Sequence, residues 1–268
     1  MLFPIGDVRM QQIEGDLLIE KQVKLSVLRL DEIHPVVSGN KLFKLHFYLE
    51  EAREKSWEGI VTFGGAYSNH LLAAAFACKD SHLESVGIVR GEQPAMLSET
   101  LQQCLRYGMQ LEFVSREQYN KKEQAEFLSE LQPKYKNYLI VPEGGYHPCG
   151  AAGAALIMDL IGADVTHICC AVGTATTIGG LLKNVSNSQH IVGFPVLKGL
   201  DDIDERLKFL TGQNFIDKQT NSLWNFEGKS ISGQMKGKQL TRLPYDEGFW
   251  FEWVAFHPKT ELYQDNTT

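Results

Sequence analysis

The segment Ser38-Gly39-Asn40-Lys41 places a lysine directly after a Gly-Asn pair, at the start of a run that is typical of an amphipathic helix. A cation in the first helical turn lies at the positive end of the helix dipole, which costs a few tenths to about 1 kcal/mol. A lysine amine there could form a Schiff base with the aldehyde of a cofactor. Taken alone, the segment is better explained as an ordinary turn with a solvent-exposed lysine.

A glycine-rich loop further along the chain adds polar side chains. Its sequence is Gly64-Gly65-Ala66-Tyr67-Ser68-Asn69-His70. The two glycines let the backbone turn tightly and approach a ligand. Ser68 is well placed to cap the following helix, which is its structural interpretation. Asn69 and His70 add polar groups that could face a ligand.

A third loop has the sequence Val172-Gly173-Thr174-Ala175-Thr176-Thr177 and opens another helix. Backbone amides at a helix N-terminus, together with threonine hydroxyls, favour a bound phosphate. The loop lacks the Gly-Lys-Ser/Thr ending of a P-loop and is not a Gly-x-Gly-x-x-Gly dinucleotide fingerprint. It therefore suits a single phosphate better than a nucleotide, and a plain capped turn is the alternative.

Apolar strand-like runs alternate with helical patterns along most of the chain. We expect helices over 41–55, 68–79, 97–107, 116–131, 150–161, 176–185 and 201–210, and strands over 59–63, 85–89, 110–114, 138–141, 167–171 and 190–195. Regular alternation of this kind predicts an α/β fold with parallel strands and right-handed crossovers. Ligands bind beyond the carboxyl ends of such strands, where these loops gather.

Composition and charge argue against several classes of function. The 268 residues carry a net charge of −7 and are 43% hydrophobic, which argues against a nucleic-acid-binding face and is typical of a globular protein. No apolar run is long enough to span a membrane, and no secretion signal is recognisable, so we expect a cytoplasmic protein. The five cysteines contain no Cys-x-x-Cys pair, and the eight histidines show no metal-binding spacing. We therefore expect free thiols and no metal site.

Five motifs occur in order, namely SGNKLFKL, GGAYSNH, PEGGYHPCGAAG, VGTATTIGG and VGFPVLKG. Over roughly residues 5–212, this set resembles the 1-aminocyclopropane-1-carboxylate deaminase/D-cysteine desulfhydrase family of pyridoxal phosphate enzymes with the tryptophan-synthase β-subunit fold. The resemblance implies two open, mostly parallel sheets flanked by helices (fold type II). It also implies a large cofactor-binding lobe, residues 1–54 and 146–268, and an inserted small lobe, residues 55–145.

The resemblance also implies roles for individual residues. Lys41 is similar to the Schiff-base lysine, which would also shuttle the α-proton, and Lys44 is the weaker candidate. Asn69 would hydrogen-bond the cofactor's 3-hydroxyl, while Ser68 would contact substrate or assist proton transfer. Tyr67 is placed where it could touch substrate, together with Ser68 and Asn69. The implied phosphate-binding loop consists of Gly173, Thr174, Ala175, Thr176 and Thr177.

Beyond about Gly212 the resemblance fades. We find no match there for the residue that contacts the pyridine nitrogen in the family. Two interpretations compete for this region. In the first, which we favour, the C-terminal part of the large lobe is impaired or altered, and activity is in doubt. In the second, the aromatic residues Trp250, Phe251 and Trp253 cover an exposed sheet or a subunit partner.

The sequence thus predicts a pyridoxal-phosphate-dependent lyase or deaminase that acts on a small amino acid. D-cysteine desulfhydrase-like elimination, giving keto acid and ammonia, is the favoured activity. The alternatives are 1-aminocyclopropane-1-carboxylate deamination, a non-catalytic pyridoxal-phosphate-binding homologue, and an α/β protein that binds a sugar phosphate or another anion. A homodimer is a further expectation that rests on the family resemblance alone.

Overall fold

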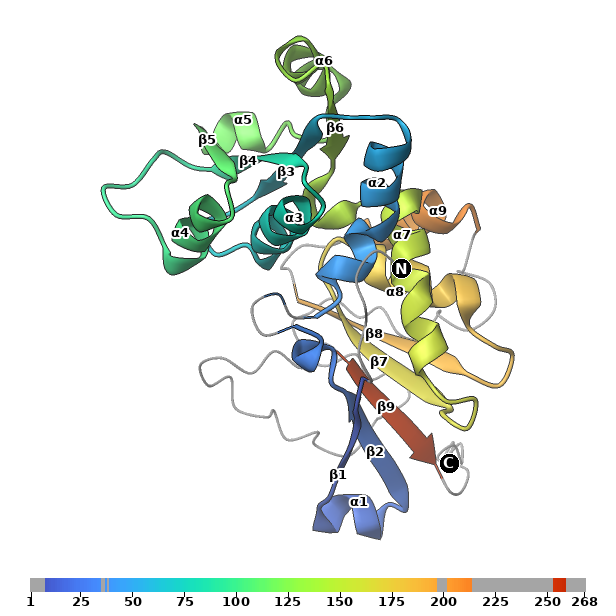
Figure 1. Ribbon diagram of the computed structural model, residues 1–268. Helices are drawn as coiled ribbons and strands as arrows, with labels where there is room; N and C mark the ends of the chain where they lie inside the picture. Colours follow the sequence, from blue (N-terminus) through green and yellow to red (C-terminus); the bar gives the residue numbers. More distant parts are fainter. Residues whose placement is uncertain (1–7, 35–36, 38, 197–201, 214–252, 259–268) are drawn as a thin grey trace.

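The computed structural model describes residues 8–34, 37, 39–196, 202–213 and 253–258. Within them the chain forms two sheets. Five strands pair in the order β1-β2-β9-β7-β8, and four pair in the order β5-β4-β3-β6. Figure 1 shows the four-stranded sheet and its helices beside the larger sheet, with α2 and α7 near the junction. The α/β fold with two helix-flanked sheets is therefore confirmed.

The larger sheet combines segments from both ends of the described chain. Its strands are β1 (Met10–Ile13), β2 (Val23–Leu28), β7 (His167–Val172), β8 (His190–Pro195) and β9 (Trp253–Pro258). β7 and β8 are parallel, whereas the pairs β1–β2, β2–β9 and β9–β7 are antiparallel. In this sheet, therefore, only β7 and β8 show the expected parallel pairing. β9 lies between β2 and β7 and runs antiparallel to both.

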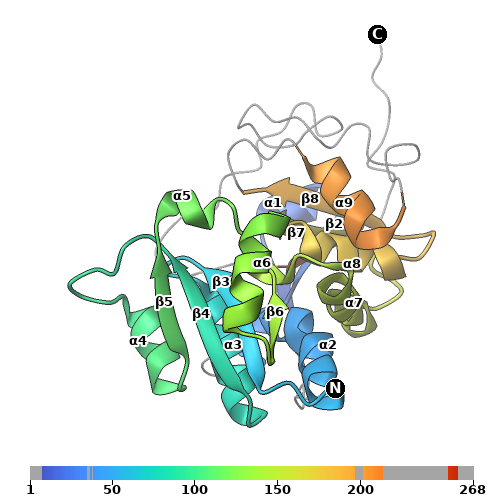
Figure 2. The same ribbon diagram turned by 90° about the horizontal axis from the view of Figure 1, so that it is seen from above.

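The smaller sheet is parallel throughout, as the strand–helix alternation predicts. It consists of β3 (Gly59–Gly64), β4 (Glu84–Arg90), β5 (Gln110–Val114) and β6 (Tyr138–Val141). α3 (Asn69–Asp80) and α4 (Glu99–Arg106) follow β3 and β4. Side chains of α3 pack with one set of alternating strand residues, and side chains of α6 (Ala125–Lys134) pack with the other set. The two helices therefore cover opposite faces of this sheet (Figure 2).

Two expected helices are shorter than the sequence pattern indicates. The segment 116–131 forms α5 (Arg116–Tyr119) and α6 instead of one helix, because Ser115 and Gln118 make a capping box that starts a separate short helix. Pro133 lies inside the last turn of α6. The segment 150–161 forms α7 (Pro148–Ala155) followed by the 3-10 helix η3 (Leu156–Leu160).

Several short elements were not expected from the pattern. They are β1, β2 and β9, the helix α1 (Asp16–Glu20), and the 3-10 helices η1 (Leu30–Glu32) and η2 (Glu143–Gly145). The remaining helices, α2 (Lys41–Glu54), α8 (Thr176–Asn184) and α9 (Ile203–Thr211), agree with the expected ranges to within two residues. Of the C-terminal aromatic residues, Trp250 and Phe251 lie outside the described residues, and Trp253 begins β9.

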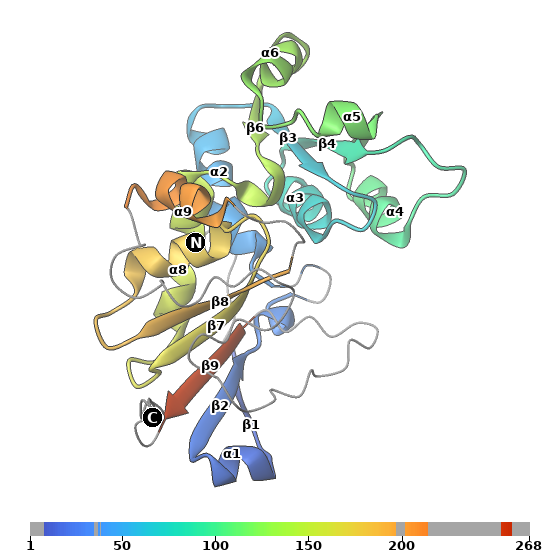
Figure 3. The same ribbon diagram turned by 180° about the vertical axis from the view of Figure 1, so that it is seen from behind.

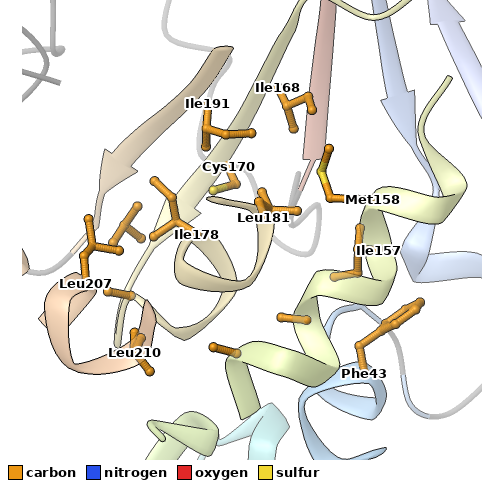
Figure 4. Close-up of a cluster of buried hydrophobic side chains, with 14 of the residues drawn as sticks. Phe43, Ile157, Met158, Ile168, Cys170, Ile178, Leu181, Ile191, Leu207 and Leu210 are labelled. Atoms are coloured by element: carbon orange, nitrogen blue, oxygen red, sulfur yellow. The ribbon is translucent and has the colours of Figure 1, made fainter. Parts of the chain in front are cut away.

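Helix α2 contributes to the cores of both sheets. Phe43 packs into the cluster around β7, whereas Leu42 and Leu45 pack with α3 and the smaller sheet. Figure 4 shows the first cluster, which contains Phe43, Ile157, Met158, Ile168, Cys170, Ile178, Leu181, Ile191, Leu207 and Leu210. Full burial of one such side chain contributes about 1.5–3 kcal/mol. The helix that begins with Lys41 is therefore held from two sides.

Candidate active site

Lys41 lies within two hydrogen bonds of the predicted phosphate loop. Its Nζ donates to Asn40 Oδ1 at 2.7 Å, and Asn40 Nδ2 donates to Thr177 Oγ1 at 2.8 Å. Lys41 is the first residue of α2, Thr177 is in the first turn of α8, and the intervening Asn40 is buried. The fold therefore brings together two segments that are 137 residues apart.

The loop between β7 and α8 has a constrained backbone. Ala175 has a φ of 63°, a left-handed conformation that costs a residue with a side chain about 1 kcal/mol or more. The hydroxyls of Thr174 and Thr176 are 2.9 Å apart and share a hydrogen bond. A Cβ placed on Gly173 would meet no described atom within 4 Å. The loop thus presents hydroxyls and the start of α8 beside open space.

The loop after β6 lies between the predicted phosphate loop and α2. Gly144 and Gly145 have φ values of 62° and 70°, which favour glycine. A Cβ on Gly144 would lie 2.9 Å from the side chain of Thr174, and one on Gly145 would lie 3.3 Å from Cβ of Lys44. The two glycines therefore let this loop fit between Lys44 and Thr174. Lys44 itself is 6% exposed, so its stem is part of the packing.

The loop after β3 carries the predicted substrate-contacting residues. Ser68 is the N-cap of α3, and its Oγ accepts a hydrogen bond from the amide of Leu71 at 3.2 Å. This is the structural role expected for Ser68, and it leaves the hydroxyl proton available. Asn69 is the first residue of α3 and its side chain is exposed, while Tyr67 is 82% exposed. The chain thus presents all three at the carboxyl end of β3.

His70 belongs to this loop and was expected to offer a polar group to a ligand, but its side chain is buried. The hydroxyl of Thr62 donates to the carbonyl of Val141 at 2.8 Å, so its oxygen accepts from Nε2 of His70 at 3.0 Å. Nδ1 of His70 is buried and has no hydrogen-bond partner among the described residues. Burial, with smaller contributions from Lys44 and Lys41, lowers the pKa of His70 to about 3. The imidazole is therefore neutral at pH 7, with Nδ1 as an acceptor.

A second polar group lies at the carboxyl ends of β4, β5 and β6. Tyr119 donates its hydroxyl proton to Glu143 Oε1 at 2.8 Å, and Lys122 Nζ is 3.3 Å from Glu143 Oε2. The guanidinium of Arg90 lies 6.0 Å from the centre of the Tyr119 ring. Sequence reasoning missed this group, since its members come from different loops. The one available signal was Glu143, which lies within the PEGG motif.

Within the described residues, no group of three His, Cys, Asp or Glu side chains is arranged to hold a metal ion. The five cysteines are free thiols. Burial is the main cause that raises the pKa of Cys149 to about 11 and of Cys78 to about 12, which disfavours the nucleophilic thiolate. No helix in the same part of the chain is long and apolar enough to cross a membrane.

Two curated proteins are similar to this chain over more than half of its length. Both are named "Putative 1-aminocyclopropane-1-carboxylate deaminase". The Pyrococcus abyssi protein is 28% identical and aligns over 65% of this chain and 56% of its own length. The Thermotoga maritima protein is 32% identical and aligns over 62% of this chain and 55% of its own length. The chain thus spans about half the length of these relatives.

A plant relative and a solved structure extend the comparison. The Arabidopsis thaliana bifunctional D-cysteine desulfhydrase/1-aminocyclopropane-1-carboxylate deaminase is 30% identical and aligns over 44% of this chain and 31% of its own length. A crystal structure of a 1-aminocyclopropane-1-carboxylate deaminase homologue has a TM-score of 0.64 and 22% identity. It covers 79% of this chain and 69% of its own, and it supports the fold.

Two family profiles match the chain. One describes a protein family of unknown function and matches residues 181–260. The other, described as "Pyridoxal-phosphate dependent enzyme", matches residues 17–198, which is more than half of the chain and includes Lys41 and the phosphate loop. Together with the two-sheet fold and the named relatives, this match confirms the predicted resemblance. The chain belongs to the family of pyridoxal-phosphate-dependent enzymes.

Proposed function

We propose that Lys41 and the loop Gly173–Thr177 hold pyridoxal phosphate, and that the chain uses it to eliminate the β-substituent of a small amino acid. The observation that carries this proposal is the path of two hydrogen bonds from Lys41 through Asn40 to Thr177. It sets the amine that would bond to the cofactor's aldehyde near the loop that would bind its phosphate. Asn40, which is buried, thus links the amine of Lys41 to the hydroxyl of Thr177.

The residues present fit this cofactor. Open space beside Gly173, the start of α8 and the hydroxyls of Thr174 and Thr176 suit a dianionic phosphate. The exposed Asn69 offers an amide that can donate to the cofactor's ring hydroxyl. The left-handed Ala175 adds a second argument, because strained backbone of this kind clusters at ligand-binding sites.

Each residue has a distinct task in this proposal. When bound, pyridoxal phosphate draws the electrons of the broken Cα–H bond into its ring. Lys41 anchors the cofactor and, once its amine is free, takes the proton from the substrate's Cα. Ser68 and Asn69 orient the substrate at the start of α3, and Tyr67 covers it. The buried links from α2 hold Lys41 in place, which favours a fixed direction of proton transfer.

We further propose D-cysteine desulfhydrase-like chemistry. Cysteine plus water would give pyruvate, hydrogen sulfide and ammonia. The Cα–H bond and the Cβ–S bond break, the sulfur leaves with its bonding electrons, and water replaces the nitrogen. The names of the relatives favour 1-aminocyclopropane-1-carboxylate deamination as a second candidate. A lobe division at residues 1–54 and 146–268 against 55–145 is part of the proposal, and the four-stranded sheet lies inside the second segment.

The decisive experiment compares Lys41→Ala with wild type after reconstitution with pyridoxal phosphate. Wild type should show the visible band of lysine-bound cofactor, and borohydride should attach the cofactor to the peptide that contains Lys41. Lys41→Ala should lose the band and at least about 10²–10⁴-fold of activity. Lys55→Ala, which removes an exposed lysine at the other end of α2, is the matched control.

The products separate the remaining candidates. Sulfide with pyruvate from D-cysteine supports the desulfhydrase, whereas ammonia and 2-oxobutyrate from 1-aminocyclopropane-1-carboxylate support the deaminase. Lysine-bound cofactor without turnover of either compound indicates a non-catalytic binding protein. A folded wild-type chain that shows no visible band would overturn the proposal. Binding of a phosphate compound that Lys41→Ala leaves unchanged would point instead to an anion-binding protein.

A further inference from the structure

Arg90 is the last residue of β4 and lies at the edge of the sheet where the site loops gather. The residue is exposed, and its guanidinium makes no hydrogen bond or ion pair with another described residue. Its neighbour across the sheet edge is the substrate loop after β3, because β3 and β4 are adjacent parallel strands. A cation thus lies beside the loop that we propose binds the substrate.

The space beside this cation is open on the loop side. A Cβ placed on Gly65 would lie 3.8 Å from Nη2 of Arg90, and no other described atom would lie within 4 Å. A side chain at position 65 would partly fill that space. Glycine therefore leaves room for a small group of the ligand between the substrate loop and the guanidinium.

The carboxylate of Glu143, which contacts Tyr119 beside Arg90, is already occupied by other donors. Glu143 receives the hydroxyl proton of Tyr119 and pairs with Lys122. Burial and the charge of Glu143 raise the pKa of Tyr119, so its hydroxyl stays protonated. The guanidinium of Arg90 lies over the ring of the same residue. A cation over an aromatic face is oriented but not neutralised. The guanidinium remains available to an anion that comes from outside the chain.

We propose that Arg90 binds a second anionic group of the substrate, at its β-substituent, and so favours amino acids with a negatively charged β-substituent over cysteine in the same β-elimination. This inference rests on the proposed function, in which Ser68 and Asn69 orient the substrate at the start of α3, and it places the α-carboxylate on that side of the loop. Arg90 lies on the β4 side of the same loop, so the two anions would occupy different places. Planar guanidinium groups suit carboxylate, sulfate and phosphate groups, which accept two parallel hydrogen bonds.

A matched pair of substrates tests this directly. Serine O-sulfate has an anionic β-substituent and 3-chloroalanine has a neutral one, and each is assayed as both enantiomers. In both, the Cα proton and the β-substituent leave, the substituent keeps the bonding electrons, and water then gives pyruvate and ammonium. Arg90→Gln should lower kcat/KM for serine O-sulfate about 10–100-fold, since charge-assisted hydrogen bonds are lost. The value for 3-chloroalanine should change less than about 3-fold.

A binding measurement gives a readout that does not depend on turnover. Aspartate and alanine cannot lose a β-substituent in this way, and their dissociation constants can be obtained from the change in cofactor absorbance. Arg90→Gln should weaken aspartate about 10–100-fold relative to alanine. Gly65→Ala, which partly fills the space beside the guanidinium, should shift the ratio in the same direction. Arg53→Gln, an exposed arginine at the far end of α2, is the control and should leave the ratio unchanged.

The outcomes separate this inference from the function on which it rests. Equal losses for the anionic and neutral compounds would mean that Arg90 binds the shared α-carboxylate, which overturns the inference. Unchanged ratios in Arg90→Gln would overturn it as well. In both cases the lysine-bound cofactor would still be visible, whereas failure of the proposed function would remove that band in wild type.

Discussion

At the scale of single residues, the site combines groups whose environments give them opposite protonation behaviour. His70 is buried and neutral, and its one proton is committed to Thr62. Tyr119 keeps its proton because burial and Glu143 both disfavour the phenolate. The guanidinium of Arg90, at the end of β4, is exposed. Neutral donors and acceptors thus lie buried around the smaller sheet, while Arg90 lies at its edge.

His70 should make the protein less stable in acid. Its pKa is about 3 in the folded state and about 6.5 in the unfolded chain, so the unfolded state binds more protons between these values. The free energy of unfolding should therefore fall as pH drops from about 6.5, by up to about 1.4 kcal/mol per pH unit. His70→Gln should flatten this dependence in urea unfolding curves recorded between about pH 4.5 and 7.

Carboxylates also contribute to acid sensitivity, so the comparison must be made between variants. His82→Gln removes an exposed histidine between α3 and β4 and serves as the control. The explanation for His70 fails if both variants change the pH slope equally, or if His70→Gln leaves it unchanged. A uniform loss of stability at all pH values would indicate a packing effect of the substitution instead.

At the scale of elements, the close approach of helices positions Lys41. α7 lies against α2, and a Cβ on Gly153 would lie 2.1 Å from the carbonyl oxygen of Phe43. α8 also lies close to α7, because a Cβ on Gly180 would lie 2.5 Å from the carbonyl oxygen of Ala151. The glycines thus let α2, the loops and the start of α8 converge (Figure 3). Glycine is needed at both contacts because any side chain would collide with the facing carbonyl oxygen.

Gly153→Ala should test this packing. The added methyl cannot fit beside the Phe43 carbonyl unless α2 and α7 move apart, which should cost at least about 1–3 kcal/mol. The melting temperature should fall by several degrees, and cofactor affinity should fall with it as Lys41 shifts. Gly15→Ala is the control, because a Cβ there meets no described atom within 4 Å. Equal melting temperatures for the two variants would contradict a close α2–α7 contact.

Elements that depend on local sequence were predictable, and those that depend on distant partners were not. The helix after Lys41 and the loop Gly173–Thr177 follow from periodicity and composition over a few residues. Arg90 and Tyr119 gain their significance only when the sheet brings their loops together. The pairing of β9 with β2 joins residues more than 200 positions apart, for which a single sequence holds no local signal.

At the scale of the whole molecule, strong and weak contacts join the two sheets. The buried face of α2 contributes to both cores and makes a strong connection. Arg206 of α9 makes a weaker one, since it pairs with Glu123 at 3.7 Å. An ion pair at this level of exposure contributes about 1 kcal/mol or less. Relative movement of the sheets is therefore opposed mainly by α2.

The larger sheet depends on a strand from the C-terminal region, beyond the point where the sequence resemblance fades. β9 lies between β2 and β7, so β1 and β2 join β7 and β8 through it (Figure 1). Ala255 is opposite Ser26 on one side and Ile168 on the other. A chain that ends at Gly212 would keep all motifs of the resemblance and still lose this connection. Both β2 and β7 would then become open edges.

Hydrogen–deuterium exchange can test this dependence on β9. In a chain that ends at Gly212, the amides of β2 and β7 should lose protection, whereas β3 and β4 should keep it, because the smaller sheet contains no part of β9. Ala255→Pro makes the same test in the full chain, since proline cannot donate to either neighbour. Ala255→Thr keeps the amide and is the control. Unchanged protection of β2 and β7 in Ala255→Pro would show that β9 does not hold the larger sheet together.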